Sequence, residues 1–308
     1  MSLYAGLDVG GTKCALSLGE CTPDSVEILA REEFPTAGKS WQEVLEEFAR
    51  RLEARPEKPA AIGISCGGPL DSRRGLVLSP PNLPGWDNVP VVRYFEERFG
   101  VPTRLQNDAN ACAYAEWKFG AGRGTRNMVF MTFGTGLGAG LVLDGRLYAG
   151  TNDNAGEIGH LRLAPTGPVG YGKEGSAEGF CSGAGIARLA AIRAAERGLD
   201  IGSPTTKDIF AKVRAGDPFF TEVFRESADK LGTILAWTID LFNPEVIVLG
   251  GVYMRNADLF EPLIAPVLER EALPLARQAC QIVPAALSEN VGDYAALAVA
   301  GMETEVAR

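Results

Sequence analysis

An asparagine and an aspartate, Asn107 and Asp108, stand between a strand-like segment and a helical one. A helix N-terminus favours an ionised carboxylate, because partial positive charge collects there. An ionised aspartate accepts a proton from an alcohol, and phosphoryl transfer asks little more of its base than orientation and late proton acceptance. Taken alone, the pair is most simply explained as a helix N-cap. We therefore expect Asp108 to cap a helix and to act as a general base.

Two glycine-rich turns, each between apolar strand-like segments, form a second pattern. The first runs through Asp8–Lys13 and the second through Gly134–Gly136. Glycine lets backbone N–H groups point at an anion without a side chain in the way. Asp8 is placed to hold Mg²⁺, directly or through water, because hard cations take carboxylate oxygens. One such turn is typical of an ordinary hairpin, whereas two predict a nucleotide held from both sides.

The only histidine of the chain, His160, follows Glu157 by three residues, and Glu178 lies further along a glycine-rich stretch. A lone histidine is more often structural than functional. Several convergent polar groups nevertheless favour a ligand pocket, and here they favour a ligand role for His160. The G-x-G-x-x-G match at residues 170–175 follows a loop and opens no clear helix, so no dinucleotide site is expected there.

Hydrophobic periodicity predicts the elements that hold these residues. Expected strands are Tyr4–Leu7, Lys13–Leu18, Val26–Phe34, Ala60–Cys66, Thr103–Leu105, Met128–Phe133, Ala139–Leu143 and Val246–Leu249. Expected helices are Ser40–Ala54, Val91–Phe99, Ala109–Phe119, Ala184–Arg197, Pro218–Leu241, Ala257–Glu271 and Asp293–Ala300. Strands and helices mix throughout, so the fold class is α/β. The strand, glycine turn and strand recur in both halves, which predicts two related lobes.

The boundary between the lobes is expected near residue 110, because the first strand–helix series ends there and the second hairpin begins soon afterwards. We predict an N-terminal lobe of residues 1–110 and a C-terminal lobe of residues 111–292. A helix in the segment from about 293 to 308 is expected to pack back on the N-terminal lobe.

Composition excludes several classes of function. The formal net charge of −9 argues against a nucleic-acid surface, which needs a basic stripe. No apolar run approaches the roughly 18 residues that span a bilayer, so no membrane partner is expected. The six cysteines show no paired spacing, and the first residues lack the features of a signal peptide. We therefore expect reduced thiols and a cytoplasmic protein.

Six motifs in order give the chain a resemblance to a known family. They read "DVGGTK", "NLPGW", "NDANACA", "TFGTGLGAG", "GEIGH" and "NPEVIVLGG". In this order the chain resembles the ROK family of sugar kinases and sugar-responsive repressors, from Tyr4 to the last helix. The resemblance implies the two-lobed actin-like, hexokinase-type fold, with ribonuclease H-like duplicated lobes that close on ATP and a sugar. It also implies phosphorylation of a hexose or amino sugar, usually at the 6-hydroxyl, in a homodimer or homotetramer.

The resemblance assigns roles position by position. Asp108 matches the catalytic base. The positions that match the nucleotide-binding ones are Asp8, Gly10, Gly11, Thr12, Lys13, Gly134, Thr135, Gly136, Gly250 and Gly251. The residues expected to bind the sugar are Gly68, Asn82, Asn107, Asp108, Glu157, His160 and Glu178. Carboxylates and amides suit a ring of hydroxyls, each of which is both a donor and an acceptor. ATP and Mg²⁺ are the expected cofactors.

Many family members also bind zinc through the histidine of this motif and three cysteines. Here Val169, Tyr171 and Ser176 stand where the cysteines would be. A structural zinc site needs four N, S or O ligands, so no structural zinc is expected. We expect Tyr171 and Val169 to fill the space with apolar packing instead.

Three rival functions stay open. The first is a sugar-responsive regulator without catalysis; an acidic chain, an intact Asn107-Asp108 pair and a first hairpin that already begins at Tyr4 count against it. The second is a kinase that uses polyphosphate, although Gly250-Gly251 suits a nucleoside. The third is a scaffold that has lost its activity, which the retained carboxylates disfavour.

Overall fold

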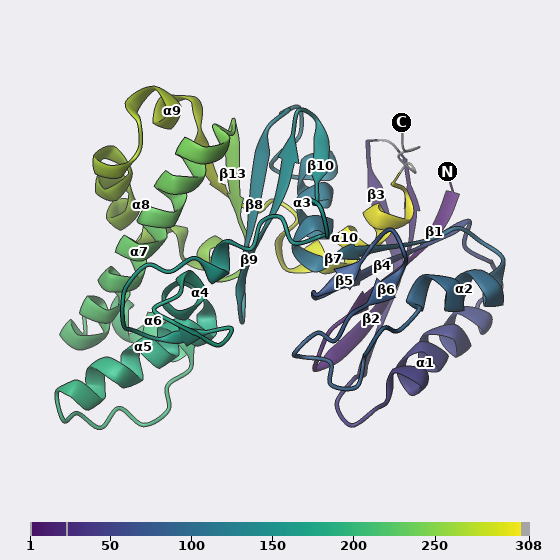
Figure 1. Cartoon of the computed structure of the whole chain (residues 1–308), viewed down its shortest axis with the longest axis horizontal. Coiled ribbons are helices and arrows are strands. Elements are labelled where there is room, and N and C mark those ends of the chain that lie inside the picture. The colour runs from purple at the N-terminus through teal and green to yellow at the C-terminus, as the bar shows by residue number, and fades with distance from the viewer. Residues whose placement is uncertain (1, 23, 303–308) are drawn as a thin grey trace.

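The computed structural model describes residues 2–22 and 24–302. It has two lobes side by side, the N-terminal one in purple and blue and the C-terminal one in teal and green (Figure 1). Both ends of the described chain lie on the N-terminal lobe. No helix among the described residues is long and apolar enough to cross a membrane.

The N-terminal lobe is built on a five-stranded sheet in the order β3-β2-β1-β4-β7. Its strands are β1 (Ser2–Val9), β2 (Lys13–Cys21), β3 (Val26–Pro35), β4 (Ala61–Cys66) and β7 (Thr103–Asn107). Strands β1, β2 and β3 are antiparallel, and β4 and β7 run parallel to β1. Helices α1 (Trp41–Glu53) and α2 (Val91–Phe99) and the short hairpin of β5 (Leu70–Asp71) and β6 (Leu76–Val77) complete this lobe.

The C-terminal lobe repeats this topology. Its sheet has the order β10-β9-β8-β13-β14, with the same sequence of antiparallel and parallel pairs. The strands are β8 (Met128–Phe133), β9 (Leu137–Leu143), β10 (Arg146–Tyr148), β13 (Val246–Leu249) and β14 (Gln281–Pro284). The glycine turns therefore occupy equivalent places, between β1 and β2 in one lobe and between β8 and β9 in the other.

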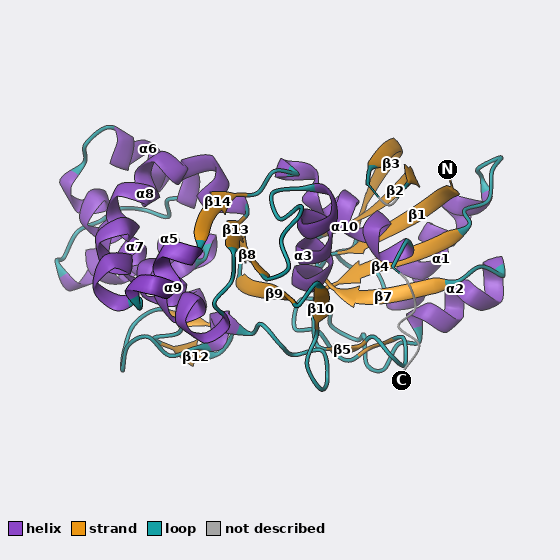
Figure 2. Ribbon diagram, turned by 90° about the horizontal axis from the view of Figure 1, so that it is seen from above, coloured by secondary structure: helices purple, strands orange, loops and turns teal. Residues whose placement is uncertain are grey.

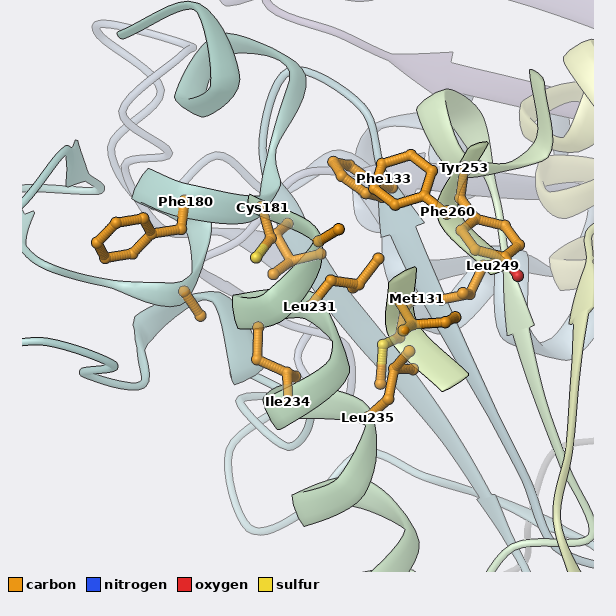
Figure 3. Close-up of a cluster of buried hydrophobic side chains, with 14 of the residues drawn as sticks. Met131, Phe133, Phe180, Cys181, Leu231, Ile234, Leu235, Leu249, Tyr253 and Phe260 are labelled. Carbon is orange, nitrogen blue, oxygen red and sulfur yellow. The ribbon is translucent and has the colours of Figure 1, made fainter. Parts of the chain in front are cut away.

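Helices cover the outer face of the second sheet. They are α4 (Ala177–Cys181), α5 (Gly183–Glu196), α6 (Thr206–Arg214), α7 (Pro218–Phe242), α8 (Gly251–Glu271) and α9 (Pro274–Ala279). Figure 3 shows their core, in which Phe133 and Tyr253 pack around Phe260 while Leu231 and Leu235 of α7 reach toward Met131 of the sheet. This apolar core fixes α5 and α8, the helices that begin beside the second glycine turn.

Two alanine-rich helices lie between the two sheets (Figure 2). Helix α3 (Asp108–Phe119) packs on β9, where a Cβ on Gly140 would lie 2.5 Å from the Cβ of Ala113. Helix α10 (Val291–Ala300) packs on the first sheet, where a Cβ on Gly63 would lie 2.1 Å from the carbonyl oxygen of Ala296. The two helices meet through small buried side chains, among them Ala111 and Ala295. Residues 303–308, which the expected C-terminal segment includes, lie outside the described residues.

The expected elements are found, and several short ones were missed. The bounds of β8, β13 and α2 agree with expectation. The expected helix from Ala257 to Glu271 is the second part of α8, which begins earlier, at Gly251, and is interrupted by the non-helical backbone of Asn256. The elements without an expectation are β5, β6, β10, β14, α4, α6, α9, the hairpin of β11 (Val169–Gly170) and β12 (Lys173–Glu174), and the 3₁₀ turns η1 (Ile158–His160) and η2 (Ser288–Asn290).

A buried carboxylate joins the two chain segments that connect the lobes. Glu116 of α3 is fully buried and accepts hydrogen bonds from the backbone N–H groups of Ala121, Ala286 and Leu287, at 2.8, 3.2 and 2.9 Å. Ala121 lies on the way from α3 to β8, whereas Ala286 and Leu287 lie on the way from β14 to α10. Removing the carboxylate leaves three donors without their acceptor.

We expect Glu116→Ala to lower the free energy of unfolding by about 3 kcal/mol, the range measured for buried donors that lose their partner. Denaturant titration measures this loss. Glu245→Ala is the matched control, because that exposed carboxylate accepts from the N–H groups of Arg126 and Asn127 and water can replace it. An equal loss in both variants would contradict the role assigned to burial.

Candidate functional site

The Asn107-Asp108 pair begins helix α3. The side-chain oxygen of Asn107 accepts from the N–H groups of Ala109 at 3.0 Å and Asn110 at 3.4 Å, which makes Asn107 the N-cap. One carboxylate oxygen of Asp108 accepts from Ala109 N–H at 2.8 Å. The expectation that Asp108 itself caps the helix was wrong, because Asn107 is the N-cap and Asp108 is the first residue of α3.

Gly67 and Gly68 follow β4 and lie at the centre of the polar side chains. A Cβ built on Gly67 would lie 3.6 Å from the amide nitrogen of Asn82 and 3.9 Å from the second carboxylate oxygen of Asp108. A Cβ on Gly68 would lie 3.2 Å from the amide nitrogen of Asn107. Asn82 and the adjacent pair Asn107-Asp108, which are far apart in the sequence, therefore surround one bare segment of backbone.

Two buried apolar side chains fix the loop that carries Asn82. Leu83 and Trp86 are almost completely buried, and they hydrogen-bond each other through the backbone. Asn82, which directly precedes Leu83, is itself exposed. The backbone of Gly11 lies so close to Asn82 that a Cβ there would stand 2.4 Å from the Asn82 carbonyl oxygen. The first glycine turn and the Asn82 loop thus touch.

The carboxylates of Asp8 and Asp108 repel one another. Burial raises the pKa of Asp8 to about 7, and the negative charges of Asp108 and Asp293 add to this rise, while Arg31 and Lys13 oppose it. Burial also raises the pKa of Asp108, although hydrogen bonds from backbone N–H groups oppose the rise. Asp108 is exposed to solvent, but protein atoms surround its carboxylate closely enough to raise its pKa.

The first glycine turn is held from outside by Thr36, just after β3. Its hydroxyl donates to the carbonyl of Gly10 at 2.7 Å, and its N–H donates to the carbonyl of Thr12 at 3.0 Å. The ammonium of Lys13 does not face the turn; it donates to the carboxylate of Glu33 at 2.6 Å. A Cβ on Gly10 would clash with the Lys13 carbonyl oxygen at 2.6 Å, so packing alone requires glycine there.

The second glycine turn faces two helix N-termini. Gly134 N–H donates to the carbonyl of Gly136, and the Gly134 carbonyl accepts from Gly183 N–H at the start of α5. A Cβ on Gly251, at the start of α8, would lie 2.2 Å from the Phe133 carbonyl oxygen. A Cβ on Gly134 would meet no protein atom, so the fold does not itself require glycine at that position. A ligand that approaches this backbone would require it.

Glu178 of α4 joins the second turn to the other polar residues. Its carboxylate accepts from Leu137 N–H at 3.2 Å, directly after Thr135 and Gly136, and a Cβ on Gly136 would lie 2.7 Å from it. Burial raises the pKa of Glu157, the charges of Asp108 and Glu178 raise it further, and His160 lowers it. Glu157, His160, Glu178 and Asp108 are therefore close enough to interact electrostatically.

The loop that follows His160 is not held by the two side chains expected to fill it. The expectation that Val169 and Tyr171 fill its interior was wrong, because Val169 is 47% and Tyr171 57% exposed. Tyr171 instead occupies the turn of the β11–β12 hairpin, with its ring edge-on to that of His160 at 6.0 Å. The buried polar side chain of this loop is that of Ser176, which is fully buried.

A contact between the lobes lies beside these residues. The N–H and hydroxyl of Ser72, between β5 and β6, both donate to the carboxylate of Asp153 at 2.8 Å. Asp153 lies four residues before Glu157, in the loop after β10. A cavity of about 300 Å³ adjoins the contact, between the β5–β6 hairpin and that loop. The loop that leads to Glu157 is thus tied to the other lobe.

Sequence reasoning missed four residues of this region: Gly67, Thr36, Gly183 and Asp293. Asp293 is buried and accepts from the hydroxyl of Ser17 and the guanidinium of Arg31, both at 2.6 Å. The glycine pair after β4 carried a weak signal for Gly67. Thr36, Gly183 and Asp293 gave none, because only folding brings them to the glycine turns and to Asp8.

Known proteins share this architecture over nearly the whole chain. The sequence profile of the ROK family matches residues 4–302. Glucokinase of Streptomyces coelicolor is 34% identical over 273 residues, 84% of each chain. The crystal structure of a ROK hexokinase from Thermus thermophilus superposes with a TM-score of 0.83 at 32% identity, over 97% of this chain and 98% of that one. A glucokinase from Streptomyces griseus, solved in complex with glucose and AMPPNP, superposes with a TM-score of 0.80 at 30% identity, over 97% of this chain and 99% of that one.

Two lobes of equal topology, each with a glycine turn between its first two strands, define the actin-like, hexokinase-type ATPase fold. The carboxylate, amide and histidine side chains between the turns give this fold a polar site. The chain belongs to the ROK family, and it is a sugar kinase of that family.

We expect Asp8→Asn to stabilise the protein at pH 8 and not at pH 4. The raised pKa of Asp8, about 7, means that the folded state binds this proton more tightly than the unfolded state. The resulting destabilisation is absent below the ordinary aspartate pKa, grows as the pH rises toward 7 and is complete above it. Because one pKa unit corresponds to about 1.4 kcal/mol, the gain in the free energy of unfolding at pH 8 is about 2–4 kcal/mol.

Thermal unfolding at both pH values, without nucleotide or Mg²⁺, measures this gain. Asp144→Asn is the control, because Asp144 is an exposed aspartate with only a distant ion pair, 3.8 Å from Arg126. A gain that is the same at pH 4 and pH 8 would show that charge is not its cause.

Proposed function

We propose that this protein transfers the γ-phosphoryl group of ATP to a hydroxyl of a hexose or amino sugar, most simply the 6-hydroxyl, with Asp108 as the general base. The observation that carries the proposal is the position of the Asp108 carboxylate. It lies at the start of α3, beside the bare backbone of Gly67 and the amide of Asn82, and it is electrostatically coupled to Asp8 at the first glycine turn.

The polar residues around Asp108 suit a sugar. Asn82 and Asn107 offer amide donors and acceptors, and Glu157 and Glu178 offer carboxylate acceptors. His160 adds a ring nitrogen to the same group. Such a site rejects analogues that lack a hydroxyl, because its own polar atoms would be left without partners. The glucokinase relatives support glucose as the first sugar to test.

The two glycine turns suit the phosphates of a nucleotide. The turn at Gly134–Gly136 has open space over Gly134 and adjoins the N-termini of α5 and α8, which favour negative charge. The Streptomyces griseus glucokinase solved with AMPPNP supports ATP as the donor.

The residues around Asp8 fit a divalent cation. Asp8 is a hard oxygen ligand whose charge is destabilised by burial and by the charges of Asp108 and Asp293, so a bound Mg²⁺ would stabilise its ionised form. When bound with ATP, Mg²⁺ would neutralise phosphate charge. The part of Asp108 is separate: it orients the sugar hydroxyl and accepts its proton, for which a raised pKa suits it.

We also propose that the protein is a homodimer or homotetramer. Large apolar side chains on α7 and α9 support this, because Leu241 is 74%, Leu273 63% and Leu275 82% exposed. Light scattering on the eluting protein measures the mass of the assembly.

Asp108→Asn should lower kcat for sugar-dependent ADP release by roughly 10²–10⁴-fold, the usual contribution of a general base. The sugar Kd should change little, since an amide still offers an acceptor. A coupled ADP-release assay over glucose, mannose, fructose and N-acetylated amino sugars, with calorimetry for binding, separates the two effects. Asp144→Asn again serves as the control.

Normal turnover by Asp108→Asn would disprove the assignment of the base. Turnover with polyphosphate but not with ATP would show that polyphosphate is the phosphoryl donor and would leave the assignment of Asp108 as the base unchanged. Binding of sugar by the unaltered protein without any ADP release would favour the sugar-responsive regulator.

A further inference from the structure

One side chain joins three segments of the loop between η1 and α4. The hydroxyl of Ser176 donates to the carbonyl of Gly170 at 3.2 Å and accepts from the N–H groups of Gly170 and Gly179, both at 3.1 Å. A hydroxyl has one donor and two acceptor sites, so these three partners satisfy it completely. A Cβ on Gly170 would lie 2.7 Å from this oxygen, which explains why the contact needs glycine.

The loop is also fixed at its two sides. The ammonium of Lys173, in the β11–β12 hairpin, donates to the carbonyl of His160 at 2.7 Å. A guanidinium nitrogen of Arg162 donates to the carbonyl of Glu174 at 2.6 Å. Gly167 rests on the ring of Phe180, where a Cβ would lie 2.6 Å from the ring. Hydrogen bonds and one aromatic ring therefore hold the whole segment.

These contacts end on the elements that carry the proposed sugar ligands. Ser176 is the N-cap of α4, in which Glu178 is the second residue. Lys173 binds the last residue of η1, His160, and Ala177 N–H donates to the carbonyl of Leu161 at 2.7 Å. Loosening either contact would allow His160 and Glu178 to move relative to each other.

The donor set does not fit a zinc ion. Zinc in a structural site takes four N, S or O ligands. Val169 offers no ligand atom, and Cys181 is buried with its thiol directed to the carbonyl of Ser227 at 3.6 Å. Within residues 2–22 and 24–302, no three His, Cys, Asp or Glu side chains lie close enough to hold a metal. A different kind of cross-link must keep His160 and Glu178 in place.

We propose that Ser176 and Lys173 are the positioning residues of the sugar site and do by hydrogen bonding what a structural metal ion would otherwise do in this loop. The proposal rests on the proposed sugar site. It makes the shape of the loop independent of metal and dependent on one buried hydroxyl and one ammonium.

Ser176→Ala removes the hydroxyl and leaves two N–H groups without their acceptor. We expect the sugar KM to rise by about tenfold, which corresponds to about 1.4 kcal/mol, while kcat and the KM for ATP change much less. Hydrogen exchange of residues 161–179 should speed up in the protein without substrate. Thr238→Val is the matched control, because it removes another buried hydroxyl, one that donates only to a carbonyl of its own helix.

Lys173→Met keeps the apolar part of the side chain and removes the ammonium. It tests the proposal even if Ser176→Ala does not fold, since Lys173 is only partly buried. The sugar KM should rise several-fold and exchange should speed up at His160, whereas Lys212→Met, on an exposed face of α6, should change neither.

Metal content provides an independent test. Elemental analysis of the purified protein should find no stoichiometric zinc, and incubation with a chelator should leave the loop exchange unchanged. One zinc per chain, or unchanged exchange and sugar KM in both variants, would overturn the proposal. The exchange measurements use no substrate, so a failure of the sugar-kinase assignment would leave them interpretable.

Discussion

The repulsion between Asp8 and Asp108 is the constraint on which the structure of the site depends. Burial raises the pKa of Asp8 to about 7, and the negative charge of Asp108 adds to this rise, so the ionised Asp8 is held at a cost in free energy. The fold keeps the two carboxylates in place with Asn107 capping α3 and with Asp293 and its partners packed behind Asp8. Such an arrangement destabilises the protein in the absence of ligand, and the proposed cation and phosphate chain would offset that cost. The stability of the protein is in this way lowered at the place where we propose that its chemistry occurs.

The duplicated topology explains how two distant segments come to face one another. Each lobe presents a glycine turn at the same edge of its sheet, and the alanine-rich helices α3 and α10 let the sheets approach closely. Glu116 then ties together the two chain segments that cross between the lobes. The distance between the turns is therefore controlled at this junction. The Ser72–Asp153 contact adds a second connection between the lobes, on the side of the residues that we propose bind the sugar.

The glycines of the site serve two different purposes. Gly10, Gly11 and Gly136 are glycine because backbone or side-chain atoms of the protein already occupy the space of a Cβ. Gly134 faces open space, so only an incoming ligand gives a reason for glycine there. The ligand-binding part of a glycine-rich motif can thus be smaller than the motif itself.

The sequence by itself determined the α/β class, the two related hairpins and the membership of a sugar-kinase family, because these depend on local periodicity and on motif order. It also determined the bounds of strands such as β8 and β13, whose apolar runs are short and continuous. Only the tertiary structure decided which side chains are buried and which segments contact one another. Val169 and Tyr171 appeared suited to a core and are exposed, whereas Ser176 appeared unremarkable and is fully buried. The partners of Ser176, Glu116 and Asp293 come from other segments, and a hydrogen bond between such segments leaves no periodic trace in the sequence.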